Sequence, residues 1–341
     1  MKKRIILLLA ALTLVGCWGR NTAGKENVAD EGKMTYYEMD GFALGTTYHI
    51  VYMAKDTVSK SAIDNILNDF VESCSIFDST SLLSRINRNE TDTVDTNIRD
   101  CIELALRLGE ESNGMYDITV KPLIEAYGFA AEGKTAHPDI DSLLEFVGYE
   151  KISLDGNRLV KQDSRIQIDL NSVAKGYCSD LVGHYFEKRG IENYLVEIGG
   201  EIATRGTNNG KEWRVGIDKP IDHNNSPGAS LQTILLLKDK GLATSGNYRR
   251  FYIDEEGNRV NHTVNPKTGL SVKQNLLSAT VLAPTCAEAD AYATLFMASG
   301  LDESIRILKE NPDLAGYLIY SETPDKYGVY ISDNLQNKIM E

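Results

Sequence analysis

Two oxygen-bearing side chains lie on an otherwise apolar stretch near the C-terminus. Asp290 and Thr294 are four residues apart in a run of Ala, Leu, Phe and Met, so a helix would place both on one face. A carboxylate in such surroundings is costly unless it is paired, hydrogen-bonded or bound to a metal. Carboxylate and hydroxyl oxygens suit a hard cation such as Mg²⁺. The spacing leaves two interpretations open: a metal site, or an aspartate that accepts hydrogen bonds from a neighbouring loop.

A second candidate is the segment 168–177, where an acidic residue, small residues and a lysine follow one another. Asp169 would end a strand, and Lys175 would lie in the first turn of the following helix. Backbone N–H groups at a helix start, together with a cation, can hold a phosphate. The order of glycines and lysine differs from a Walker A loop. Ordinary helix capping by Asn171 or Ser172 explains the same pattern equally well.

The third candidate is a histidine beside a strong turn signal. The chain has 5 histidines, and His262 precedes the Asn-Pro-x-x-Gly turn at 265–269. An imidazole in such a loop is a candidate general acid or base. By spacing alone, a surface histidine without a chemical role is the favoured interpretation. Glycines in the loops 197–201 and 243–250 would allow close approach to a ligand, or would simply form turns.

The strands and helices that must position these residues are mixed along the chain. Apolar patterning predicts strands at 47–53, 166–170, 194–198, 213–217, 233–237 and 277–282, and helices at 61–74, 96–109, 174–189 and 288–299. Thr285 and Glu288 have capping-box spacing and predict the start of the last helix. There is no regular βαβ alternation and no G-x-G-x-x-G motif after the first strand, so a Rossmann fold is disfavoured. We predict an α+β fold: a single catalytic unit of mixed sheets and helices, which could comprise two lobes.

The first residues are predicted to be a targeting signal. Three basic residues at 2–4 precede an apolar run that is shorter than the roughly 20 residues a spanning helix needs. The run ends in Leu-Val-Gly-Cys at 14–17, which is typical of a bacterial lipobox; a plain signal peptide with a chance cysteine is the alternative. We therefore expect a lipoprotein signal peptide over 1–16, a lipidated Cys17 with a flexible tether over 17–33, and a catalytic domain over 34–341. Such a protein is exported, anchored to the membrane and faces the periplasm.

Charge limits the possible partners. The chain has 36 basic and 49 acidic residues, and its formal net charge of −13 argues against a nucleic acid as partner. Removal of the three basic residues at 2–4 with the signal would lower this charge to −16 (−13 − 3). A phosphorylated ligand on so acidic a protein would need a metal ion between the ligand and the protein.

The other cysteines, Cys74, Cys101, Cys178 and Cys286, form no C-x-x-C pair and are expected to be small core residues.

Taken in order, these segments resemble the ApbE family, the FAD:protein FMN transferases. The matching stretches are 44–48, 81–87, 114–123, 127–129, 169–176, 199–200, 243–250, 262–269 and 283–294. The resemblance implies a Mg²⁺-dependent enzyme that cleaves FAD at its pyrophosphate. It would join FMN through a phosphoester to a Thr or Ser hydroxyl of an acceptor protein and release AMP. Lipoprotein export is common in the family. The acceptor implied is a subunit of a sodium-pumping or electron-bifurcating membrane complex, or a flavin-dependent reductase.

The resemblance also assigns roles to residues. It implies that the metal ligands are the side chains of Asp290 and Thr294 and the main-chain carbonyl of Ala174. It implies flavin contacts at Leu44, Phe77, Met115, Tyr116, Asp117, Asp169, Lys175 and Thr263. His262 matches the acid–base histidine and would take the proton of the acceptor hydroxyl. Lys175 would balance the charge that grows on the departing AMP.

The chain departs from the family pattern at four positions, which are Leu44 (often Met), Phe77 (commonly Tyr), Lys121 (usually Gly) and Asn171 (usually Gly or Ser). These differences could change the balance between transfer of FMN and hydrolysis of FAD. Two alternatives follow: a Mg²⁺-dependent FAD pyrophosphatase that yields FMN and AMP, and a non-catalytic FAD-binding lipoprotein. A carrier needs no hard-metal site together with a base, so Asp290, Thr294 and His262 argue against the carrier.

Overall fold

The computed structural model describes residues 33–129, 138–221, 228, 230–248, 251–323 and 326–340. The chain divides into two units, Met1–Lys33 and Met34–Glu341, and the second contains the fold described below. The predicted signal peptide, Cys17 and nearly all of the predicted tether lie outside the described residues. No helix in the described part of the chain is long and apolar enough to cross a membrane.

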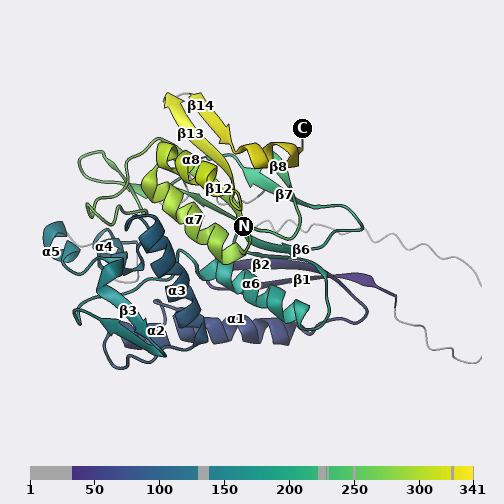
Figure 1. Ribbon diagram of the computed structural model, residues 1–341, viewed down its shortest axis with the longest axis horizontal. Helices are drawn as coiled ribbons and strands as arrows, with labels where there is room; N and C mark the ends of the chain where they lie inside the picture. Colours follow the sequence, from purple (N-terminus) through teal and green to yellow (C-terminus); the bar gives the residue numbers. More distant parts are fainter. Residues whose placement is uncertain are drawn as a thin grey trace, which may run out of the picture. The chain divides into compact units, whose positions relative to one another are not determined.

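An eight-stranded antiparallel sheet forms the centre of the fold, in the order β1-β2-β5-β6-β9-β12-β13-β14 (Figure 1). Its strands are β1 (Thr35–Ala43), β2 (Thr46–Ala54), β5 (Asn193–Ile198), β6 (Glu201–Arg205), β9 (Gly241–Gly246), β12 (Leu276–Ala283), β13 (Ala315–Thr323) and β14 (Lys326–Ile331). The register pairs β6 with β9 only at Ile202↔Leu242 and Ala203↔Gly241. Toward Gly199 and Thr244 the register of the described strands contains no further pair, so the sheet opens there.

Helices cover one face of this sheet. The central helices α6 (Ala174–Glu187) and α7 (Cys286–Ser299) pack against β5, β6, β9 and β12 (Figure 1). Their outer neighbours include α1 (Lys60–Cys74), α3 (Thr96–Glu111) and α8 (Leu301–Glu310). The short helices are α2 (Leu82–Asn87), α4 (Lys121–Ala126) and α5 (Ile140–Leu144). The core between the sheet and the helices contains the four cysteines expected there as buried thiols.

A smaller three-stranded sheet lies on the other side of the large one. It has the order β15-β8-β7 and consists of β7 (Trp213–Asp218), β8 (Leu231–Leu237) and β15 (Ile339–Met340). A second apolar core joins the two sheets and includes Trp213, Ile217, Leu235, Leu242 and Tyr317. Two further hairpins are β3 (Ile152–Asp155) with β4 (Arg158–Lys161), and β10 (Phe251–Ile253) with β11 (Arg259–Asn261). Mixed helices and antiparallel sheets confirm the α+β prediction and the absence of a Rossmann fold.

The predicted strand at 166–170 is wrong. This segment has no strand partner in the described chain, although Ile166, Ile168 and Leu170 are buried as a strand pattern would suggest. The side chain of Asn87 donates to the carbonyl oxygen of Ile168 (2.9 Å) and accepts from its backbone N–H (2.8 Å). The backbone N–H of Asp169 donates to the carbonyl of Ile118 (2.8 Å). Because these groups satisfy the backbone, the segment is buried without joining a sheet.

Two capping predictions had different outcomes. Thr285 is the N-cap of α7 and accepts from the backbone N–H of Glu288 (3.1 Å), which confirms the capping box. Capping of α6 by Asn171 or Ser172 is wrong, because Val173 occupies the N-cap and no side chain caps this helix. The hydroxyl of Ser172 instead lies 2.7 Å from that of Tyr116.

Candidate active site

The predicted site residues meet in one cavity of about 420 Å³. It is lined by all of those that lie in the described chain: Leu44, Phe77, Met115, Tyr116, Asp117, Asp169, Ala174, Lys175, His262, Thr263, Asp290 and Thr294. They come from the β1–β2 turn, the loop after α1, the segment after α3, the start of α6, the loop after β11 and the middle of α7. The fold therefore brings together residues that are up to 250 positions apart (294 − 44).

Asp290 is buried where α6 begins beside α7. Its Oδ2 accepts from the backbone N–H of Gly176 at 3.0 Å. A Cβ on Gly176 would lie 2.3 Å from the carbonyl oxygen of Cys286, so only glycine permits this approach of the two helices. Burial raises the pKa of Asp290, and the charge of Lys175 opposes the rise. The hydrogen bond matches the alternative in which Asp290 is held by a neighbouring segment, and it still leaves the second carboxylate oxygen for other partners.

The donors around Asp290 fit a hard cation. The Thr294 side chain lies one turn further along α7 and lines the same cavity as Asp290 and Ala174. Carboxylate, hydroxyl and carbonyl oxygens are the ligand types that Mg²⁺ takes. With only 3 % of its surface exposed, the Asp290 carboxylate is unfavourable as a charged group unless a positive charge lies close to it. A bound cation would supply that charge.

Lys175 is not a free cation in this cavity. Its Nζ lies 2.7 Å from Oε1 of Glu201, a carboxylate that is only 4 % exposed. Burial by itself would lower the pKa of Lys175, but the charges of Asp290 and Glu201 raise it overall. The lysine is therefore protonated, and its charge is shared between two buried carboxylates.

Hydrogen bonds hold the other polar side chains of the cavity in place. Asp117 accepts from the backbone N–H (2.8 Å) and the hydroxyl (2.6 Å) of Thr119, and burial raises the pKa of Asp117 to about 6. Asp169 accepts from the backbone N–H of Asn171 at 2.7 Å, and burial raises its pKa. Phe77 is 59 % exposed, so it offers a ring at the mouth of the cavity.

His262 lies at the cavity, half-buried, and is not a lone surface histidine. Its ring packs edge-on against Phe129, with ring centroids 6.2 Å apart and planes at 68°. The hydroxyl of the next residue, Thr263, donates to Oδ1 of Asn247 at 2.9 Å. One face of the environment of the imidazole is thus aromatic, and the hydrogen bond of Thr263 anchors the adjacent residue of the loop.

Sequence reasoning missed several residues of the cavity. Glu201, Thr244 and Ser245 belong to the loops 197–201 and 243–250, for which only the glycines were predicted to approach a ligand or form turns, and none of the three residues was predicted to be a site residue. The sequence offered one signal for Glu201, which is its position directly after Gly199-Gly200. Its partner Lys175 is 26 residues away (201 − 175), so only the fold shows that the two side chains form a pair. Lys121, a departure from the family pattern, does not line the cavity; its Nζ contacts Gln167 (2.8 Å) and Glu125.

Comparison with known proteins agrees with the expected family. The family model described as "ApbE family" matches residues 44–318. A FAD:protein FMN transferase of Vibrio cholerae is 32 % identical to this chain, and the match covers 98 % of this chain and 98 % of the relative. A FAD:protein FMN transferase of Haemophilus influenzae is 33 % identical, and the match covers 92 % of this chain and 91 % of the relative. The solved structure of the flavin transferase ApbE from Vibrio cholerae has a TM-score of 0.77 at 31 % identity, covering 90 % of this chain and 100 % of that one. The relatives confirm the expected fold and enzyme class, and the chain belongs to the ApbE family.

Proposed function

We propose that this protein transfers FMN from FAD to a Thr or Ser hydroxyl of an acceptor protein, with Mg²⁺ as the required metal and AMP as the second product. The observation that carries the proposal is the meeting of an oxygen donor set (Asp290, Thr294, Ala174), a charged lysine (Lys175) and a histidine in one cavity. The names of the relatives support flavin transfer from FAD to protein. The roles of the individual residues are part of the proposal.

In the proposed reaction the acceptor oxygen attacks the phosphorus on the FMN side of the pyrophosphate. A new P–O bond to the hydroxyl oxygen forms as the bond to the bridging oxygen breaks. AMP leaves with that electron pair, and the imidazole of His262 takes the hydroxyl proton. A threonine or serine hydroxyl is a weak nucleophile at neutral pH, so the base is needed.

The charges of the cavity explain why a metal is required. Lys175 contributes one positive charge, whereas Glu201 and Asp290 contribute two negative charges when both are ionised. The three groups together would repel a pyrophosphate. A Mg²⁺ ion held by Asp290 and Thr294, with the carbonyl of Ala174, would neutralise phosphate oxygens and polarise the phosphorus. Lys175 is then a fixed charge oriented by Glu201, placed to balance the departing phosphate.

The proposed location follows from the N-terminal pattern. We propose that Cys17 is lipidated and that the protein is exported and anchored to a membrane, facing the periplasm, where a membrane redox subunit would be its acceptor. Labelling with a palmitate analogue in cells tests the anchor. Wild type should incorporate the label and Cys17→Ser should not; equal labelling of both would contradict the assignment.

One experiment separates transfer from hydrolysis and from simple binding. The protein is incubated with FAD, Mg²⁺ and a candidate acceptor, and the products are separated on a denaturing gel and by chromatography. Fluorescence that survives on the acceptor band, with an added mass equal to FMN minus one water, together with one AMP per modified acceptor supports transfer. Free FMN and AMP with an unmodified acceptor would instead support a pyrophosphatase, and unchanged FAD would support a carrier. EDTA should abolish product formation.

A further inference from the structure

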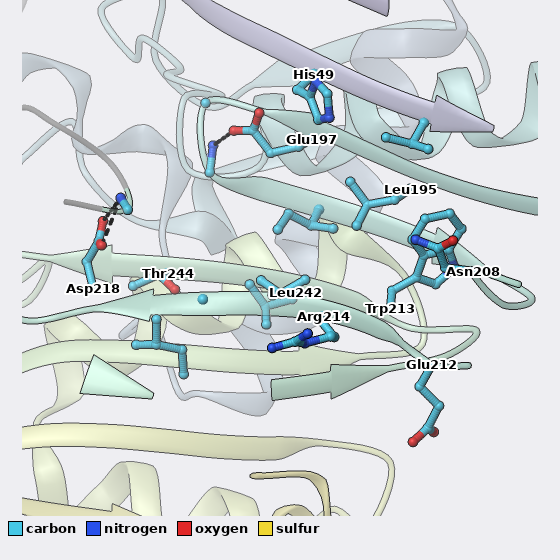
Figure 2. A pocket seen from close by; sticks show the side chains of 18 of the residues that line it. His49, Leu195, Glu197, Asn208, Glu212, Trp213, Arg214, Asp218, Leu242 and Thr244 are labelled. Carbon is cyan, nitrogen blue, oxygen red and sulfur yellow. Dashed lines mark hydrogen bonds between the residues drawn. The ribbon is translucent and has the colours of Figure 1, made fainter. Parts of the chain in front are cut away.

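A second cavity, of about 680 Å³, lies between the large sheet and the smaller one (Figure 2). Its walls come from β2 and β5 (His49, Val51, Leu195), from β9 (Leu242) and from β7. Val51, Leu195 and Leu242 contribute to the second core, on the side of the large sheet away from α6 and α7. The flavin-transfer chemistry proposed above leaves this cavity without a role.

The cavity follows β7 along its whole length. All six consecutive residues of Trp213–Asp218 line it. Neighbouring side chains of a strand point to opposite faces, so a cavity that touches all six residues also contacts the main chain of β7. Among the described residues, β7 is the outermost strand of its sheet and pairs with β8 on one side. An extended polypeptide can bind such an edge through main-chain hydrogen bonds.

The cavity wall that faces this edge has an apolar middle and polar ends. Leu195 and Leu242 lie in the middle in Figure 2, and His49 and Glu197 lie to one side; Val51 lines the same cavity. Nδ1 of His49 is 2.7 Å from Oδ1 of Asp40, and Glu197 accepts from the backbone N–H of Gly200 at 2.6 Å. Alternate side chains of a bound strand would therefore meet an apolar surface, while its main chain would lie beside β7.

The two cavities adjoin where the large sheet opens. Gly199 and Thr244 line both of them. These residues belong to the β5–β6 turn and to β9, at the end where the described β6 and β9 are no longer paired. Gly199 packs against the aliphatic part of the Lys175 side chain and against Thr46, because a Cβ placed on it would be 3.1 Å from Cδ of Lys175 and 2.7 Å from Cγ2 of Thr46. The two cavities are thus separated only by Gly199 and Thr244, and a passage between these residues would connect them.

We propose that the second cavity is the acceptor site: a segment of the acceptor protein binds in extended conformation beside β7 and presents its hydroxyl between Gly199 and Thr244. This inference rests on the proposed function, because it supplies the second substrate of that reaction. The six residues of β7 span about 20 Å, so an acceptor segment of about six residues in extended conformation would match the length of this strand. The polypeptide then approaches from one face of the sheet and FAD from the other, so neither substrate blocks the other.

The test uses substitutions that fill the apolar middle of the cavity. Val51→Trp and Leu195→Trp are assayed with FAD, Mg²⁺ and a pool of twelve-residue peptides that each carry one central threonine. Glu38→Trp is the matched control, since Glu38 is exposed and pairs with Val51 across the β1–β2 register but does not line the cavity. We expect at least a tenfold rise in KM for the peptides in both cavity variants, with kcat and the Kd for FAD nearly unchanged. The control should match wild type.

A second measurement keeps the proposal testable if the tryptophan variants fold poorly. Amide hydrogen exchange of the wild-type protein is recorded with FAD, with and without a peptide selected from the pool. Exchange within Trp213–Asp218 should slow when the peptide is present, while exchange in β1 should not change.

The possible failures are distinguishable. If wild type neither cleaves FAD nor modifies a peptide, the proposed function fails and this inference fails with it. If wild type modifies peptides but the cavity variants keep the wild-type KM, or β7 shows no protection, only the acceptor site is overturned. Cleavage of FAD without modification of any peptide in the pool would also overturn the acceptor site and would favour the pyrophosphatase.

Discussion

The two cavities on opposite faces of the large sheet are built in different ways. The first draws its lining from segments spread between Leu44 and Ala298 and contains two buried carboxylates, Glu201 and Asp290, beside Lys175. The second is lined mainly by neighbouring strands and by one strand edge, and its acidic side chains Glu197, Glu212 and Asp218 are only half-buried. Catalysis at a phosphate requires charged groups that are held in place in a site shielded from water. Binding of an extended polypeptide requires a strand edge whose main chain is accessible. The difference predicts that substitutions in the first cavity change kcat and those in the second change KM.

The largest effect is expected for Asp290→Asn. The amide keeps the size of the side chain and can still accept from Gly176, but it cannot neutralise a cation. We expect kcat for transfer to fall by about 10³-fold, the loss typical of removing a main electrostatic contact. Product formation is measured against Mg²⁺ concentration. Asp95→Asn, at the cap of α3 outside both cavities, is the control; an Asp290→Asn enzyme with wild-type activity and metal dependence would contradict the metal assignment.

The next largest effect concerns stability and contrasts Glu201 with Glu197. Glu201→Ala leaves Lys175 in the cavity without the carboxylate at 2.7 Å, so the free energy of unfolding should fall by about 3 kcal/mol. Glu197→Ala removes one hydrogen bond to Gly200 from a half-buried group and should cost about 1 kcal/mol. Urea unfolding of the two variants measures both values. Equal losses would show that the first cavity does not depend on its buried pair.

Two histidines, one beside each cavity, give a third contrast. His262→Ala should lower kcat by about 10²-fold, because the acceptor proton loses its base. His49→Ala should leave kcat at the wild-type value, since His49 lies in the second cavity and is paired with Asp40. Steady-state rates at saturating FAD and acceptor measure both. If kcat fell equally in His49→Ala and His262→Ala, the result would contradict the assignment of catalysis to the first cavity and of acceptor binding to the second.

A smaller effect is expected at the mouth of the first cavity. Phe77→Ala removes an exposed ring that can stack on a flavin, and the Kd for FAD should rise by roughly fivefold, which corresponds to about 1 kcal/mol. Phe42→Ala is the matched control, because Phe42 is even more exposed and lines neither cavity. Quenching of flavin fluorescence gives both affinities. A Kd that does not change in Phe77→Ala would place the flavin ring elsewhere.

A separate effect is a pH dependence of stability that comes from Asp117. Burial raises the pKa of this carboxyl to about 6, above its usual value near 4. Between these values the unfolded chain releases its proton while the folded protein keeps it, so this group lowers stability as the pH rises from about 4 to about 6. The Tm of Asp117→Asn should fall less over that range than the Tm of wild type. Parallel Tm curves would assign the pH dependence to other buried carboxyls.

Local patterns sufficed for the elements and for part of the site. Periodicity located the helices at α1, α3, α6 and α7, and the spacing of Thr285 and Glu288 located the start of α7. These features depend on residues within a few positions of one another, so the sequence contains them. The order of motifs likewise pointed to the family, and with it to twelve of the residues that line the first cavity.

Tertiary structure decided what depends on distant partners. The segment 166–170 is no strand because Asn87, about 80 positions earlier, takes its backbone hydrogen bonds. The pairing of Lys175 with Glu201 and the opening between β6 and β9 also arise only when remote segments meet. A hydrogen bond or an ion pair depends on distance in space, and a sequence specifies that distance only for near neighbours. The second cavity, which lies between two sheets, therefore exists only in the folded chain.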